Sequence, residues 1–198
     1  MRIYTMTRTT TLKDLCRGVL RYVGNGYVYY KITHIPIQKA HKTAQILKKV
    51  SDTYETNLTQ GKRQYRRKQK IANYQAISFR GMIIIFRTSG EHKDNPHEFK
   101  KINSKGLELT ISEHLKLILF KDERGKWTYR LGKENYAFFS QEIKKSFEKR
   151  NGIKYHSLKK MFNNLPIYIG IGKQKKELNK LIKELQHTYK NKRNWDLF

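Results

Sequence analysis

The spacing of apolar and polar side chains predicts strands and amphipathic helices along most of the chain. Short stretches rich in β-branched and aromatic residues, bounded by turn residues, predict strands over residues 27–32, 75–79, 82–88, 107–111, 115–121 and 126–131. Apolar residues at helical spacing predict helices over residues 38–54, 133–150, 156–164 and 173–192. The last helix has its apolar residues on one stripe and is the clearest of the four.

The N-terminal part allows two interpretations. Thr11 is a suitable N-cap for a helix that begins at Leu12. Alternatively, residues 19–23 and 27–32 pair as a hairpin around an Asn-Gly turn. Both interpretations place a strand at 27–32.

The order of the predicted elements favours an α+β fold. Strands and helices gather in separate blocks, which is typical of an antiparallel sheet with helices packed on it. The first part of the chain would suit a ferredoxin-like, split βαβ core. We therefore expect an α+β core over 1–132, with a basic segment at 61–72, and a basic helical part over 133–198 that packs on the core.

Charge is the unusual property of the composition. The 198 residues include 43 Lys and Arg but only 16 Asp and Glu, which gives a formal net charge of +27. Because such a surface repels itself, it indicates a polyanionic partner, either nucleic acid or an anionic membrane surface. The chain is also rich in Lys, Ile, Tyr and Asn, which AT-rich codons encode, and this is typical of low-GC bacteria, organelles, phages and mobile elements.

Other features exclude several classes of protein. The single cysteine, Cys16, allows no internal disulfide and no zinc site built from several thiolates. No apolar run is long enough to span a membrane, and the first residues lack the apolar core of a secretory signal. We expect a cytoplasmic or nucleoid-associated protein, with an organellar location as the alternative, and we expect no cofactor and no bound metal.

The densest basic run is residues 62–70, which contain six positive charges and no acid. A phosphate backbone would relieve the repulsion between like charges on such a helix. The residues expected to clamp phosphates are Lys62, Arg63, Arg66, Arg67, Lys68 and Lys70. Tyr65 or Tyr74 could stack on exposed bases. A solvated charged face or a localisation tag is the alternative interpretation.

A second basic surface is predicted on the last helix. Its apolar stripe should face the core, which leaves its lysines on the open side. The expected phosphate contacts are Lys173, Lys176, Lys180 and Lys183. Binding to anionic lipid is the alternative, although the helix lacks a Trp or Phe anchor. Residues 170–173 do not have the spacing of a phosphate-binding loop and are expected to form the turn before this helix.

Aromatic residues of the predicted strands offer a further possibility. Tyr27, Tyr29, Phe79 and Phe86 resemble a stacking platform of the kind that sheet-based RNA-binding domains use. The alternative is that they belong to the core.

Only one segment concentrates groups suited to catalysis or metal binding. The loop at 91–98 includes His92, Asp94, His97 and Glu98, which could hold a divalent metal beside a phosphodiester, but a polar turn is the simpler interpretation. Tyr136, near the start of a helix, is a candidate nucleophile. However, the chain has no pair of histidines flanking one apolar residue, which single-strand nucleases with a tyrosine nucleophile need.

The sequence therefore predicts a nucleic-acid-binding protein whose contacts are mainly to phosphates, with RNA slightly favoured over DNA. A ribonucleoprotein component, in contact with other proteins, or an accessory protein of a mobile element would suit these features. The first alternative is a nuclease or strand-transfer enzyme, and the second is a protein that binds anionic membranes or other polyanions.

Overall fold

The computed structural model describes residues 7–92 and 98–190. It has an α+β fold divided into two compact units, Met1–Asn103 and Ser104–Phe198, and each unit is described by itself. The expected division at 132 differs from this one, because the hairpin strands before 132 share a core with the helices that follow them. The N-terminal unit has a net charge of +15 and the C-terminal unit +12.

The N-terminal unit is built around a five-stranded sheet. Its elements are β1 (Thr7–Arg8), α1 (Leu12–Gly24), β2 (Tyr29–His34), the 3-10 helix η1 (Ile37–Lys42), α2 (Thr43–Thr53), α3 (Gln60–Lys68), β3 (Tyr74–Phe79), β4 (Met82–Arg87) and β5 (Lys100–Lys101). The strand order is β1-β3-β4-β2-β5, with β1 parallel to β3 and the other neighbours antiparallel. This element order differs from the β-α-β-β-α-β order of a ferredoxin-like core.

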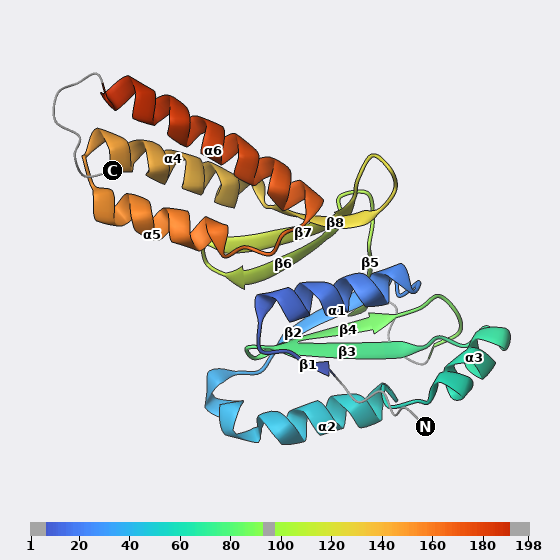
Figure 1. The fold of residues 1–198 in the computed structure, drawn as a ribbon. Helices are drawn as coiled ribbons and strands as arrows, with labels where there is room; N and C mark the ends of the chain where they lie inside the picture. Colours follow the sequence, from blue (N-terminus) through green and yellow to red (C-terminus); the bar gives the residue numbers. More distant parts are fainter. Residues whose placement is uncertain (1–6, 93–97, 191–198) are drawn as a thin grey trace. The chain divides into compact units, whose positions relative to one another are not determined.

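Helices cover both faces of this sheet (Figure 1). On one face, Gly18 of α1 lies directly against Ile77 of β3. On the other face, Ile46, Leu47 and Val50 of α2 pack against a cluster that includes Ala76 and Ile83. Side chains alternate between the two faces of a strand. Because helices cover both faces, every residue of β4 is buried.

The structure decides between the two interpretations of the N-terminal part. Thr11 caps α1, because the backbone N–H of Asp14 donates to its Oγ1 at 3.1 Å. The strand proposed at 19–23 is therefore wrong, while the strand after the turn is confirmed as β2. The β3–β4 hairpin is also confirmed: Arg80 and Gly81 both have positive φ, as a two-residue type I′ turn requires.

The C-terminal unit combines a three-stranded antiparallel sheet with three helices (Figure 1). Its elements are β6 (Leu107–Ser112), β7 (Leu115–Lys121), β8 (Trp127–Leu131), α4 (Lys133–Glu148), α5 (Gly152–Asn163) and α6 (Ile169–Lys190). One face of the sheet is apolar and buried, and the helices bury an aromatic cluster in which Phe139 contacts Phe162 and Phe147 contacts Tyr155.

Helix α6 begins earlier than the sequence predicts. Residues 170–173, expected to be a turn, lie in its first turns. A Cβ atom at Gly170 would lie 2.5 Å from the carbonyl oxygen of Tyr129, so only glycine lets the helix approach β8 this closely. None of the helices in the described residues is long and apolar enough to cross a membrane.

The thiol of Cys16 should react slowly with alkylating reagents. The side chain, on α1, is fully buried, and this burial raises the pKa of the thiol to about 12. Because the thiolate is the reactive form, we expect modification at pH 8 to be at least about 100-fold slower in the native protein than in guanidinium chloride. Equal rates in the two conditions would contradict the packing of α1.

Candidate nucleic-acid interface

Helix α3 carries most of the dense basic run, and it has no buried side chain. Its nine residues include no acid and no aliphatic side chain, so apolar packing cannot hold it in place. Thr59 caps its first turn by accepting a hydrogen bond from the N–H of Lys62. The helix must therefore be attached to the rest of the unit by polar contacts.

Arg63 supplies the main attachment. Its Nε donates to the carbonyl oxygen of Leu58 at 2.9 Å. Its Nη1 donates to the hydroxyl of Tyr27 at 3.0 Å and to the carbonyl oxygen of Tyr74 at 3.2 Å, and its Nη2 donates to the carbonyl oxygen of Thr56. Arg63 was expected to clamp phosphate, but the structure gives it a different role as the anchor of α3.

Two further arginines of α3 contact the protein. Arg66 forms an ion pair with Glu55, in the loop before the helix. Arg67 is exposed, and its Nη2 donates to the carbonyl oxygen of Asn25 at 3.2 Å. These contacts tie α3 to its preceding loop and to the end of α1.

The other basic residues of the run are exposed as expected. Lys62, Lys68 and Lys70 are exposed, and Tyr65 between them has 64% of its surface accessible. Lys70 lies just beyond the helix with a φ of 57°. There the N–H groups of Lys70 and Ile71 donate to carbonyls of the last turn, a Schellman ending that usually requires glycine. We call Lys62, Tyr65, Lys68 and Lys70 the α3 surface.

The aromatic residues of the strands belong to the core. Tyr27, Phe79 and Phe86 are almost fully buried, and α1 covers Phe86 through a ring contact with Tyr22. Tyr29 and Tyr74 pack against the cluster under α2. A stacking platform on the sheet is therefore wrong, because helices cover both faces. Tyr65 is the better candidate for stacking than Tyr74.

Helix α6 carries the second basic surface in the C-terminal unit. Lys176, Lys180 and Lys183 are exposed and lie on one stripe of the helix. Lys180 is 3.9 Å from Glu184 in an exposed pair of the kind that contributes little. We call these three lysines the α6 surface.

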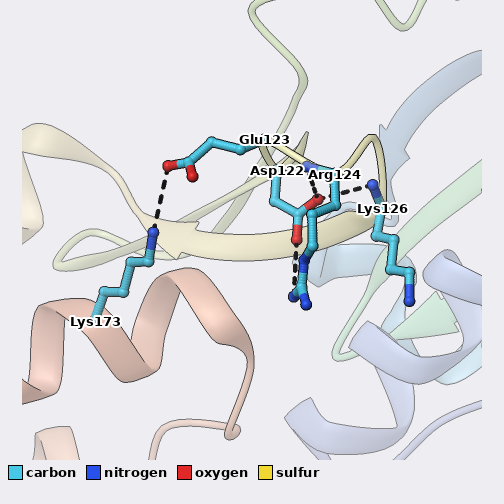
Figure 2. Close-up of polar contacts among 5 residues, drawn as sticks. All are labelled: Asp122, Glu123, Arg124, Lys126 and Lys173. Atoms are coloured by element: carbon cyan, nitrogen blue, oxygen red, sulfur yellow. Dashed lines mark hydrogen bonds and ion pairs between the residues drawn. The ribbon is translucent and has the colours of Figure 1, made fainter.

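Lys173 lies one turn earlier and has a nearby acid. Figure 2 shows its ammonium directed at Glu123, in the turn between β7 and β8, at 3.5 Å. In the same turn Asp122 accepts hydrogen bonds from the backbone N–H groups of Arg124 and Lys126, which lower the pKa of its carboxyl group. The turn is thus well ordered by hydrogen bonds, and Glu123 offsets part of the charge of Lys173.

Lys175 has a structural role. Its ammonium donates to the carbonyl oxygens of Asn163, the last residue of α5, and of Leu165, at 2.9 and 3.0 Å. Burial lowers the pKa of this lysine. The position of Lys175 on a basic helix does not by itself distinguish this residue from the exposed lysines beside it.

A pocket of about 310 Å³ lies between the end of α1, the strand β3 and α3. We call it the arginine pocket, because three guanidinium groups line it and none of its lining residues in the described part of the chain is acidic. Its lining residues are Arg21, Tyr22, Asn25, Tyr27, Gln60, Arg63, Gln64, Arg67 and Gln75. The sequence does not indicate Arg21 as a site residue, because no local pattern connects it with α3.

The candidate catalytic loop borders a different pocket of about 640 Å³. His92 and Glu98 line it together with Glu91, Glu55 and Arg66, whereas Asp94 and His97 lie outside the described residues. Glu98 also forms an ion pair with Lys31 at 2.6 Å. Within residues 7–92 and 98–190, no group of three or more His, Cys, Asp or Glu side chains could hold a metal ion.

Tyr136 is unsuited to act as a nucleophile. Its hydroxyl donates to the carboxylate of Glu177 at 2.8 Å. Partial burial, together with this carboxylate, raises the pKa of the phenol to about 12. The phenolate form that would attack a phosphodiester is therefore disfavoured.

Comparison of the chain with protein-family models, with curated proteins and with solved structures finds no significant match. The candidate sites therefore depend on the geometry and charge of this chain alone.

Proposed function

We propose that the chain binds nucleic acid, mainly through phosphate groups, with RNA slightly favoured over DNA. The observation that carries the proposal is the construction of α3. The helix has no apolar face and no acid of its own, and arginine contacts attach it to the unit while the α3 surface is exposed. Such a helix repels itself in water, and a polyphosphate backbone would relieve that repulsion.

The exposed lysines of α6 support the proposal independently. Lysine contacts phosphate as a point charge and does not read bases, so both surfaces suit binding that tolerates many sequences. An exposed tyrosine among the cations suits single-stranded or irregular targets, whose bases are free to stack. A ribonucleoprotein or a mobile element, in which nucleic acid is available to the chain, is the setting we propose.

Titration over a salt series tests this function. Binding of the full chain to a structured RNA and to a duplex DNA of equal length would be measured between 50 and 300 mM salt. We expect the logarithm of the binding constant to fall linearly and steeply with the logarithm of salt concentration for both, with the RNA bound more tightly. A shallow slope, or equal binding to anionic lipid vesicles, would contradict the proposal.

Replacing Tyr65 with alanine should weaken binding to single-stranded RNA by about 5-fold or more, because stacking contributes about 1–3 kcal/mol per base. Binding to duplex DNA should change by less than about two-fold, since duplex bases are already stacked. Tyr65→Phe, which keeps the ring, serves as the control and should retain wild-type affinity. A similar loss on both nucleic acids would assign Tyr65 a different role.

The pocket beside the 91–98 loop favours one second candidate function, cleavage of the bound strand. Histidine and carboxylate side chains share that pocket with Arg66, a set suited to acid–base chemistry on a phosphodiester. Incubation of labelled RNA and DNA with excess protein and Mg²⁺ or Mn²⁺ tests it. Cleavage that His92→Ala abolishes would support an enzyme, and intact substrates would exclude one under those conditions.

A further inference from the structure

The arginine pocket differs from the two exposed surfaces because it is concave and lined by three arginines. Arg21 lies at the end of α1, whereas Arg63 and Arg67 lie one turn apart on α3. The three guanidinium groups therefore approach the same volume from two different helices. Gln60, the first residue of α3, also lines the pocket, so the positive end of that helix dipole adds to the field.

The positive charge of the pocket is not neutralised by the contacts of its exposed arginines. Arg21 donates to the hydroxyl of Tyr22 at 3.4 Å and lies over the ring of that tyrosine. Arg67 donates to a backbone carbonyl. Both partners are neutral, and each guanidinium has five N–H donors, so these arginines retain their charge and most of their donors for a ligand.

Size and shape limit what the pocket can hold. Its volume of about 310 Å³ is at the lower end of small-ligand sites and suits one nucleotide-sized group. A backbone phosphodiester carries one negative charge and needs a path in and out for the strand. A phosphate monoester carries about 1.5 to 2 negative charges near pH 7 and enters from one side. Bidentate contacts from several arginines match the monoester better.

We propose that the arginine pocket binds a phosphate monoester, either the terminal phosphate of a nucleic-acid strand or the phosphate of a free nucleotide. The first source rests on the proposed nucleic-acid binding, and the second does not. Arg21 and Arg67 contact the phosphate oxygens. Arg63 keeps its hydrogen bonds to the protein and contributes charge from the wall of the pocket. The neutral amides of Gln60 and Gln64 are donors for the sugar hydroxyls.

The test compares one single-stranded RNA in three forms: with a 5′-phosphate, with a 3′-phosphate and with hydroxyl groups at both ends. We expect the full chain to bind one of the phosphorylated forms at least about 10-fold more tightly than the hydroxyl form. The Arg21→Gln, Arg67→Gln double variant should remove this preference. Lys68→Gln is the matched control on the same helix, and it should weaken all three forms by the same factor.

A second arm uses adenosine 5′-monophosphate and adenosine as the free ligands. If the wild type binds the monophosphate but not adenosine, and the double variant does not bind the monophosphate, the pocket takes free nucleotides, whatever the result with RNA. If the three RNA forms bind equally and the monophosphate does not bind, the pocket proposal is overturned while nucleic-acid binding stands. If no RNA form binds and the monophosphate does, the proposed function fails and the pocket proposal stands.

The pH dependence gives an independent readout. No histidine or carboxylate lines the pocket in the described part of the chain, so the group that titrates between pH 5 and 7.5 is the phosphate monoester itself. The preference for the phosphorylated form should rise as pH rises through about 6, where the monoester becomes a dianion. A preference that does not change over this range would contradict recognition of the dianion.

Discussion

Replacing Arg63 with alanine should lower the free energy of unfolding of the N-terminal unit by about 3 kcal/mol or more, because each hydrogen bond to a charged group contributes about 1.5–3 kcal/mol and its loss leaves acceptors without this donor. The side chain donates to three backbone carbonyls and to the hydroxyl of Tyr27. Without it, those oxygens lose this donor. Helix α3, which has no buried side chain of its own, would then detach.

Two measurements test the effect of Arg63→Ala on stability. Chemical denaturation monitored by circular dichroism gives the loss of stability, and the rate of Cys16 labelling reports on the N-terminal unit alone, because Cys16 is the only cysteine of the chain. Lys62→Ala, on the same helix but exposed, is the matched control and should change the unfolding free energy by less than about 0.5 kcal/mol. Arg63→Lys should also destabilise, because lysine lacks the planar fork. Stability equal to wild type in Arg63→Ala would show that α3 is held by other contacts.

The elements with strong hydrophobic periodicity could be predicted from the sequence. The continuous apolar run 82–86 became the fully buried strand β4, and the stripe of the last helix became the core-facing side of α6, where Leu178 and Ile182 are buried. Each of these elements is stabilised by apolar burial, and the positions of its own apolar residues in the sequence indicate which side is buried. The β3–β4 turn was also predictable, because Gly81 supplies one of the two positive φ angles that it needs.

The inward side of α3 could not be predicted in this way. A run of Lys, Arg and Gln has no apolar periodicity, so nothing local distinguishes Arg63 from Lys62. The distinction comes from partners that are distant in the sequence, such as Tyr27, which is 36 positions away. The same limit applies to Arg21, whose place in the arginine pocket depends on where the tertiary fold brings α1 and α3. Long-range contacts also decide that the chain divides at Asn103.

The basic run thus has two physical roles that charge alone does not separate. Arg63 and Arg66 use the fork of the guanidinium group to replace the apolar contacts that α3 lacks. The lysines, which are point charges on flexible stems, remain exposed. If binding depends on the α3 surface, removing lysines should change affinity without changing stability. Removing Arg63 should lower stability first, and affinity with it, because the α3 surface depends on this anchor.

Replacing Lys62, Lys68 and Lys70 together with glutamine should weaken RNA binding by about 50-fold at 0.15 M salt. Each phosphate contact to a single strand contributes about 0.7 to the slope of the logarithm of the binding constant against the logarithm of salt concentration, so three contacts contribute about 2. The three side chains are exposed, and we expect the unfolding free energy to stay close to that of the wild type. Titration of the same RNA over a salt series gives the slope and the affinity together.

A second triple variant, Lys42→Gln, Lys48→Gln, Lys49→Gln, removes the same charge from exposed positions of η1 and α2 in the same unit. It should lower the affinity by less than about three-fold, because only long-range attraction is reduced. The slope should fall by less than about 0.7, the value for one phosphate contact. Equal losses in the two triple variants would mean that the net charge of the unit, and not the α3 surface, drives binding. A loss confined to the α3 variant would separate local phosphate contacts from the general attraction of a basic protein for a polyanion.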